Sequence, residues 1–417
     1  MTSWKTSPVV VVGAGAAGLL AAIFARRAGA EVLVLETRVR PGAKIRVSGG
    51  GRCNVLPSRA ELDDFASNGS MNAVRNVLRS WPLDEVLEFF EVELGVPLKV
   101  EATGKVFPVS DNAREIVDAL LGECERLGVR WVGEFRVAGL TPKTDGFQVD
   151  GADGQRVQAE RVVLSSGGLS LPRTGSDGGG LRVAAALGHR LEPDFPALVP
   201  LLSEEPRLNV LAGLSLPVEI RACRGQKVLE RRSGDFLFTH RGYSGPVVLD
   251  ISRHVTSGGD GVQIRVAWRG ADAPDWDAVL RQGGSRQVST ALREELPRRL
   301  ADTLMELASV APEKKLSLLS REERKRLVEV LADYPLPIAG NEGYATAEVT
   351  GGGVPLKEVH LKTLESRLVP GLHFAGEILD VVGRIGGYNF LWAWVTGRKA
   401  GEGAAGALPG LSVESDG

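Results

Sequence analysis

A short stretch near the N-terminus constrains the fold more than any other part of the chain. The β-branched run PVVVV (8–12) predicts a strand buried on both faces, as in a parallel sheet. GAGAAG follows at once with the spacing G-x-G-x-x-G, and an apolar stretch typical of a helix then ends near Gly29. EVLVLE (31–36) predicts a second strand, which Glu36 closes. This order of elements predicts an α/β fold of the Rossmann type that binds a dinucleotide.

Each glycine of this motif has a physical role in holding a pyrophosphate. Gly13 permits the tight turn, Gly15 lets the phosphates approach the backbone, and Gly18 lets the helix pack closely on the strand. The free N–H groups and the dipole of the helix N-terminus favour the phosphate charge. Glu36 is suited to accept hydrogen bonds from an adenosine ribose, and an acid there disfavours a 2′-phosphate. The bound nucleotide is therefore predicted to be FAD or NAD rather than NADP.

The C-terminal part of the sequence favours FAD over NAD. GLHFAG (371–376) predicts a strand that ends at Gly376-Glu377, and a helix is expected to begin near Gly387. In a flavin site, an acid after such a strand holds ribitol hydroxyls. The positive end of the following helix faces the flavin edge where charge collects on reduction. Both ends of the chain are therefore expected to build one site.

The composition changes between these two parts, which predicts an insertion. We expect an FAD-binding domain made of residues 1–191 and 344–417, interrupted by an inserted domain, 192–343. Alternating runs predict a β-rich part over 192–272, and the composition of 273–335 is helical. Within the first part, residues 110–129 predict an amphipathic helix capped by Ser110 or Asp111.

Charge and cysteine content limit the classes of partner. The net charge is −2, the three cysteines are far apart without a CxxC, and no run of 18 apolar residues occurs. We therefore expect no metal site, no disulfide framework, no nucleic-acid partner and no membrane span, in a cytoplasmic protein whose oligomeric state stays open.

Six segments together resemble the BaiN/HI0933-like group of FAD-dependent oxidoreductases. They are VVGAGAAGL (11–19), PGAKIRVSGGGRCNV (41–55), SSGGLSLPRTGSDGGGLRVAAALGH (165–189), FTHRGYSGPVVLDIS (238–252), VTGGGV (349–354) and GLHFAGEILDVVGRIGGYNFLWAWVTGRKAG (371–401). The resemblance implies a glutathione-reductase-like FAD domain with an inserted β-barrel-like domain that carries a helical subdomain. The chain departs from the family pattern at Val382, Ile385 and Leu391, which stand where polar residues are usual.

The resemblance also explains the glycine-rich loop SGGGRCN (48–54), which is similar to a segment that wraps FAD. Arg52 and Lys44 are candidates to neutralise the pyrophosphate or polarise the flavin. Cys53 has two interpretations, a redox role or packing against FAD, and the absence of a CxxC partner favours packing. The predicted FAD-binding residues are Gly13, Gly15, Ala16, Ala17, Gly18, Glu36, Thr37, Lys44, Ser48, Gly50, Arg52, Cys53, Asn54, Val137, Ser166, Gly167, Gly376, Glu377, Gly387, Tyr388 and Asn389.

The predicted activity is hydride transfer between the flavin and a small organic substrate, which is expected between the flavin and the insertion. The candidate catalytic residues are His240, Arg241, Tyr243 and Tyr388. No second G-x-G-x-x-G occurs, so NAD(P)H is expected to act as a transient donor if it acts at all. Three alternatives stay open. One is an amine-type oxidase that uses oxygen. Another is an FAD-bearing RNA-modifying or RNA-binding protein with RRLADTL (298–304) and REERKRL (321–327) as its contact surface. The third is a flavin-binding protein without turnover.

Overall fold

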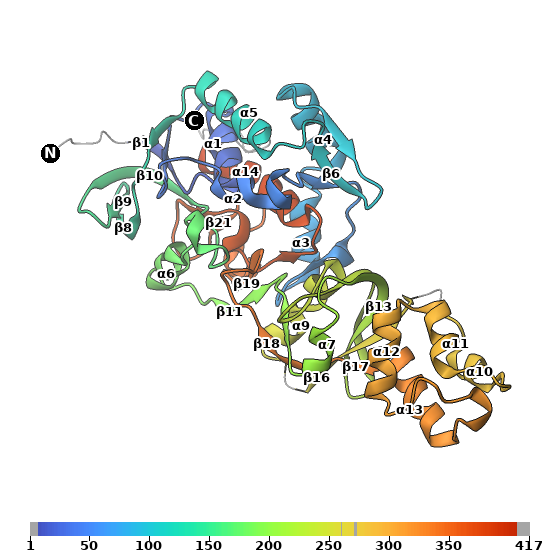
Figure 1. Ribbon diagram of the computed structural model, residues 1–417. Helices are drawn as coiled ribbons and strands as arrows, with labels where there is room; N and C mark the ends of the chain where they lie inside the picture. The colour runs from blue at the N-terminus through green and yellow to red at the C-terminus, as the bar shows by residue number, and fades with distance from the viewer. Residues whose placement is uncertain (1–6, 260, 271–272, 407–417) are drawn as a thin grey trace. The chain divides into compact units, whose positions relative to one another are not determined.

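The computed structural model describes residues 7–259, 261–270 and 273–406, and the chain forms two compact units (Figure 1). Unit 1 consists of residues 1–195 and 349–417, and unit 2 of residues 196–348. The predicted boundaries, 191/192 and 343/344, lie four and five residues before the observed ones. Each unit has its own buried hydrophobic core.

The centre of unit 1 is a parallel sheet with the strand order β22-β10-β1-β2-β7. These strands are β1 (Ser7–Val12), β2 (Val32–Leu35), β7 (Arg130–Val132), β10 (Arg156–Leu164) and β22 (Leu372–Phe374). Antiparallel strands extend it: β8 (Val137–Lys143), β9 (Gly146–Gly151), β20 (Val359–His360) and β21 (Glu365–Ser366). The C-terminal strand β22 thus pairs inside the sheet that the N-terminal strand begins.

Helices and short strands complete unit 1. The helices are α1 (Ala16–Arg27), α2 (Ala43–Val47), α3 (Met71–Leu78), α4 (Leu83–Glu88), α5 (Ala113–Arg126), α6 (Gly179–Ala186) and α14 (Tyr388–Ala404). The short strands are β3 (Leu56–Pro57), β4 (Phe65–Ala66), β5 (Leu98–Val100), β6 (Lys105–Pro108), β11 (Glu192–Ala197), β19 (Val349–Gly353) and β23 (Val382–Gly383). The predicted helix over 110–129 forms as α5, but its cap is Asn112, whose side chain accepts from Arg114 N. Ser110 and Asp111 are therefore not the cap.

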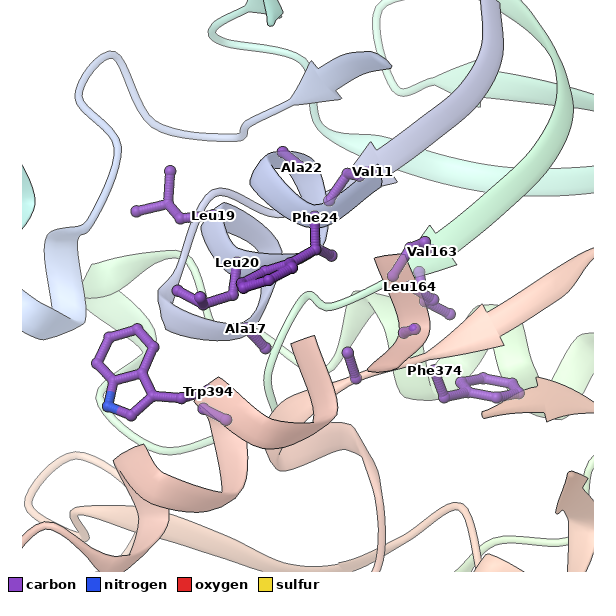
Figure 2. Close-up of a cluster of buried hydrophobic side chains, with 14 of the residues drawn as sticks. Val11, Ala17, Leu19, Leu20, Ala22, Phe24, Val163, Leu164, Phe374 and Trp394 are labelled. Atoms are coloured by element: carbon purple, nitrogen blue, oxygen red, sulfur yellow. The ribbon is translucent and has the colours of Figure 1, made fainter. Parts of the chain in front are cut away.

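Helices α1 and α14, from opposite ends of the chain, pack in direct contact. A Cβ added at Gly397 would overlap the carbonyl oxygen of Ala17 and lie 2.9 Å from Leu20 Cβ. One added at Gly401 would lie 2.9 Å from the carbonyl carbon of Ala21. Figure 2 shows side chains of both helices in one cluster with side chains of β1, β10 and β22. The predicted union of the two chain ends in one domain is confirmed.

Unit 2 is built on a seven-stranded antiparallel sheet with the order β17-β16-β13-β14-β15-β12-β18. Its strands are β12 (Leu201–Ser203), β13 (Ser215–Arg224), β14 (Lys227–Phe238), β15 (Gly242–Ser244), β16 (Val262–Trp268), β17 (Tyr334–Pro335) and β18 (Ile338–Asn341). Its helices are α7 (Pro206–Asn209), α8 (Pro246–Ile251), α9 (Arg253–Thr256), α10 (Trp276–Arg281), α11 (Val288–Glu295), α12 (Arg298–Leu307) and α13 (Arg321–Ala332). The β-rich and helical parts predicted for the insertion are both present.

Candidate functional site

The first βα turn has the backbone that a pyrophosphate site requires. Gly13 has φ +98°, and a Cβ there would lie 2.8 Å from the Ser165 carbonyl oxygen. A Cβ at Gly18 would overlap the Gly13 carbonyl oxygen, so the helix can approach the turn only with glycine there. A Cβ at Gly15, in contrast, would meet no atom within 4 Å. Gly15 therefore borders open space at the N-terminus of α1, where no side chain caps the first turn.

Glu36, at the end of β2, is fixed beside this turn. Its Oε2 accepts from Ala14 N at 2.6 Å and its Oε1 from Arg38 N at 2.8 Å. Burial raises the pKa of the carboxyl, although the N–H groups of Arg38 and Ala14 lower it. Since the N–H group of Thr37 also bonds the carboxylate, one of its four lone-pair positions stays open to a further donor, such as a ribose hydroxyl. Thr37 is the next residue along this edge.

Ser166 provides a direct test of whether this site suits a cofactor. It follows β10, and its Cα lies 3.0 Å from the position that a Cβ on Gly13 would take. Its Oγ is buried and has no hydrogen-bond partner among the described residues. A buried hydroxyl without a partner is costly, and a polar ligand group would satisfy it. Together with the open space at Gly15, this orphaned hydroxyl fits a bound dinucleotide.

The loop that carries SGGGRCN takes the conformation that its glycines permit. Gly49, Gly50 and Gly51 have φ of +55°, +69° and +86°, and Cys53 has φ +60°. Three consecutive left-handed residues, as at 49–51, are accessible at low cost only to glycine. A Cβ at Gly50 would meet no atom within 4 Å. The loop therefore leaves room on one side, while Ser48 anchors its start by donating to the Ile45 carbonyl oxygen.

Cys53 and Asn54 follow this glycine run as buried residues. Burial raises the pKa of the Cys53 thiol to about 12, so the thiolate is disfavoured at neutral pH. With its amide oriented to satisfy both ends, Asn54 donates to Leu56 O at 3.1 Å and accepts from Gly387 N at 3.2 Å. Asn54 therefore ties the loop to the N-terminus of α14. These contacts favour the packing interpretation of Cys53 over the redox one.

Lys44 and Glu377 meet in a polar network that joins both chain ends. Lys44 Nζ lies 2.7 Å from Glu377 Oε2 and donates to Ser170 Oγ at 3.0 Å. Ser170 Oγ in turn donates to Glu377 Oε1 at 2.8 Å, which also accepts from Thr350 N. Lys44 and Glu377 are 22% and 16% exposed, so the pair is partly desolvated. These contacts hold the side chains of Lys44 and Glu377 in fixed positions.

The N-terminus of α14 is held by a tight loop. Gly387 has φ +94°, and a Cβ there would lie 2.8 Å from Leu56 Cα. Asn389 closes the loop, since its Oδ1 accepts from Gly383 N at 2.8 Å and its Nδ2 donates to Gly383 O at 2.9 Å. The half-buried ring of Tyr388 packs edge-to-face on Phe65 with centroids 5.9 Å apart. Asn389 therefore shapes the loop, and Tyr388 opens the helix.

Two residues predicted to bind FAD, Arg52 and Val137, make contacts with other parts of the protein. Arg52 lies 4.0 Å above the Phe107 ring, and its Nη1 pairs with Glu101 at 2.6 Å and with Asp111 at 3.3 Å. These two acids pair with the guanidinium, and a pyrophosphate contact of Arg52 stays a prediction. Val137, at the start of β8, pairs with Gly151 and is half-buried.

The sequence interpretation missed a clamp between segments 64–68 and 380–384. Asp380, which is 2% exposed, accepts from Asn68 N at 2.9 Å and from Ser67 Oγ at 3.0 Å. Burial raises the pKa of its carboxyl to about 6, against the hydrogen bonds from Asn68 and Ser67. Arg384 Nη1 bonds Asp64 Oδ1 at 3.0 Å beside the β4–β23 pairing. Only an acid inside an otherwise apolar run, ILDVV (378–382), signalled it in the sequence.

The candidate catalytic residues of the insertion lie around one bend in unit 2. Tyr243 is fully buried, and its hydroxyl bonds Ser203 Oγ at 2.7 Å and Pro337 O at 3.0 Å. Burial raises the pKa of Tyr243, and both contacts are structural. His240 and Arg241 are exposed, with Arg241 3.7 Å from Glu342. His189 is also structural, since its ring nitrogens bond Glu358 at 2.6 Å and Ser366 at 2.8 Å.

Comparison with known proteins decides the family. The model of the HI0933-like protein Rossmann domain matches residues 7–403. The chain belongs to this family. It is 35% identical over 396 residues to the ribosomal RNA dihydrouridine synthase of Escherichia coli (strain K12), covering 92% of this chain and 94% of that one. It is also 35% identical over 409 residues to a 3-dehydro-bile acid delta(4,6)-reductase of Clostridium scindens, covering 95% and 98%.

A solved structure supports the fold alone. The 3-ketosteroid delta1-dehydrogenase of Sterolibacterium denitrificans aligns over 97% of this chain and 100% of its own, with a TM-score of 0.52 at 15% identity. The family assignment confirms the predicted resemblance, the Rossmann-type FAD-binding fold and the class of flavin-dependent oxidoreductase. The expected exclusion of nucleic acid is not supported, because a ribosomal RNA enzyme is among the relatives. No helix within the described ranges is long and apolar enough to cross a membrane.

Proposed function

We propose that this protein is an FAD-dependent reductase that adds a hydride and a proton across an activated carbon–carbon double bond. The names of two relatives, each 35% identical, support this chemistry, because both describe the reduction of such a bond. Their substrates, a uridine in RNA and a bile acid, otherwise share little. The common reaction is therefore a better guide than either substrate.

The observation that carries the proposal is that both ends of the chain meet at the first turn of α1. Gly376 has φ +79°, and a Cβ there would lie 2.8 Å from Ala17 Cβ, in the first turn of α1. The C-terminal strand end and the pyrophosphate turn are thus adjacent. We expect the turn at Gly13–Gly18 to bind the pyrophosphate, Glu36 the ribose, and Ser166 one further polar group of FAD.

FAD, when bound, supplies the hydride chemistry, and the protein supplies orientation, electrostatics and the proton. The N-terminus of α14 is held by Asn54 and Asn389, and the positive end of this helix would stabilise negative charge on a bound flavin. Lys44, fixed by Glu377 and Ser170, keeps a third N–H for a ligand oxygen. Tyr388 is the residue of unit 1 that we assign as the proton donor to the carbon next to the carbonyl.

NAD(P)H is the proposed source of electrons. The sequence has no second G-x-G-x-x-G unit, so a dedicated nicotinamide domain is not expected. We propose that NAD(P)H binds transiently and leaves before the unsaturated substrate is reduced. The exposed His240 and Arg241 of unit 2 stay candidates for contact with one of these ligands.

An anaerobic substrate panel tests the proposal. The purified yellow protein is mixed with NADH, NADPH or an amine, and bleaching of the flavin absorption band is followed. The reduced protein is then mixed with uridine-containing RNA or with an unsaturated 3-oxo bile acid, and recovery of the band is followed with product mass. Bleaching by NAD(P)H and a product two mass units heavier are expected. Bleaching by the amine with peroxide formed in air would instead identify an oxidase.

A further inference from the structure

The β-rich part of unit 2 carries an excess of basic residues that the net charge of the chain conceals. Residues 196–270 contain ten Lys and Arg against seven Asp and Glu, whereas residues 271–348 contain eleven against fourteen. The two opposite imbalances cancel in the total. Acids of the second segment offset part of this excess, because Asp333 pairs with Arg221 and Arg265, and Glu295 pairs with Arg269. The remaining excess lies on basic residues that these acids do not pair.

Two of these basic residues, Arg224 and Lys227, lie where the β13–β14 hairpin ends beside α9. Arg224 and Lys227 are directly paired across the hairpin end, and both are exposed. A Cβ on Gly259 would lie 3.3 Å from Arg224 Nη2 and 3.1 Å from His254 O, so the Arg224 guanidinium lies beside the end of α9. The structure gives neither Arg224 nor Lys227 an acidic partner among the residues it describes. Both charges are therefore available to a ligand.

Three basic side chains, one from β14 and two from α9, converge on the buried carboxylate of Glu230 on β14. Glu230 Oε2 lies 2.6 Å from Arg253 Nη2 and 2.5 Å from His254 Nε2, and Glu230 Oε1 pairs with Arg232. Burial raises the pKa of Glu230, but the contacts with His254, Arg253 and Arg232 outweigh it and hold the pKa below its usual value. One negative charge thus faces two permanent positive charges. Arg232 Nε, moreover, is buried with no partner among the described residues.

We infer that this basic cluster, defined as Arg224, Lys227, Arg232, Arg253 and His254, binds the phosphate backbone of an RNA substrate. Arginine guanidinium groups match phosphate geometry, and such contacts position a nucleic acid without reading its sequence. The inference rests on the proposed function in one respect, because it chooses RNA over a bile-acid-like substrate. In the helical part, nearby acids pair some of the cations, since Arg324 bonds Asp277 at 2.9 Å and Lys314 bonds Glu323 at 2.6 Å.

The test measures binding of a fluorescein-labelled, uridine-containing RNA hairpin to the FAD-loaded protein by fluorescence anisotropy at several salt concentrations. The variant is Arg224→Gln combined with Lys227→Gln, which removes two exposed charges and leaves the Glu230 network intact. Because each phosphate contact contributes about 0.9 to the slope of log affinity against log salt, the double variant should lose about two from that slope. The matched control is Arg298→Gln, which removes an arginine that is 79% exposed on α12.

The expected result is weaker RNA binding and a shallower salt slope for the double variant, with the control unchanged. Equal binding by wild type and double variant, or no RNA binding by the wild type, overturns the inference. Stronger binding to vesicles of phosphatidylserine than to RNA also overturns it. Binding is measured without turnover, and bleaching by NAD(P)H is measured separately in both variants. If NAD(P)H fails to bleach the flavin, the reductase proposal fails, but the RNA-binding measurement still tests the basic cluster.

Discussion

Substitution of Gly397 by alanine tests the contact that brings the two chain ends together. A Cβ at this position would overlap the Ala17 carbonyl oxygen and lie 2.9 Å from Leu20 Cβ, so α14 or α1 must shift. Overpacking of this kind costs about 1–3 kcal/mol, and the upper end applies because the obstructing atom belongs to the backbone. The higher helix propensity of alanine offsets about 1 kcal/mol of that cost. The expected net loss is about 2 kcal/mol.

A matched control is available in another helix of the same unit. Gly122 lies within α5, and a Cβ there would meet no atom within 4 Å. Gly122→Ala should therefore stabilise the protein by about 1 kcal/mol through helix propensity alone. The two variants make the same chemical change, so their opposite signs isolate the helix contact.

Thermal unfolding, followed by the release of flavin fluorescence, is the assay. A loss of about 2 kcal/mol should lower the midpoint of Gly397→Ala by about 4–8 °C, and Gly122→Ala should raise it by about 2–4 °C. We also expect Gly397→Ala to release flavin at lower temperature, because the first turn of α1 moves with the helix. A midpoint for Gly397→Ala equal to or above that of the wild type would refute the close packing of α1 and α14.

Further predictions address the site. Tyr388→Phe should lower kcat about 100-fold with flavin content unchanged, if the hydroxyl donates the proton, and steady-state kinetics will show this. Cys53 should resist iodoacetamide in the folded protein at pH 8, as mass spectrometry can determine, because burial holds its pKa near 12. Because burial raises the pKa of Asp380 from 3.8 to about 6, the wild type should lose up to roughly 3 kcal/mol relative to Asp380→Asn as pH rises from 4 to 7. Melting curves across that range measure it. Lys44→Met should weaken FAD binding by leaving Glu377 unpaired, which flavin fluorescence titration detects.

The sequence predicted best those elements whose local pattern has a single structural meaning. The strand, glycine turn and helix over 8–27 were predicted because G-x-G-x-x-G needs both a left-handed residue at Gly13 and close packing at Gly18. The union of the chain ends followed from the strand predicted to end at Gly376, which forms as β22 (Leu372–Phe374), and from the helix that begins after Gly387. At each of these positions, a side chain larger than hydrogen would overlap a neighbouring residue in the chain or one adjacent element, so the glycine itself indicates the local structure.

Contacts between distant polar residues could not be predicted in the same way. Asp380 and Asn68, for example, are 312 positions apart, and neither has a local pattern that names the other. The ion pairs of Arg52 were not predictable either. Its place in a cofactor loop suggested a phosphate contact, and β5–β6 with the turn after it bring Glu101 and Asp111 to the guanidinium. A charge takes the partner that the tertiary fold supplies, and residue type alone does not name it.

Net charge is a weak guide to partners for a related reason, because it sums charges that are distributed unevenly over the protein surface. A phosphate backbone responds to charges within about 10 Å at moderate salt, so only acids close to the end of the β13–β14 hairpin offset the cations there. What matters there is whether a local acid is available, and the carboxylate of Glu230 is already shared by Arg232, Arg253 and His254. Arg224 and Lys227, left with no acidic partner among the described residues, then decide the sign of the surface. A chain with a total charge of −2 can therefore present a positive face wherever one buried acid is outnumbered by its neighbours.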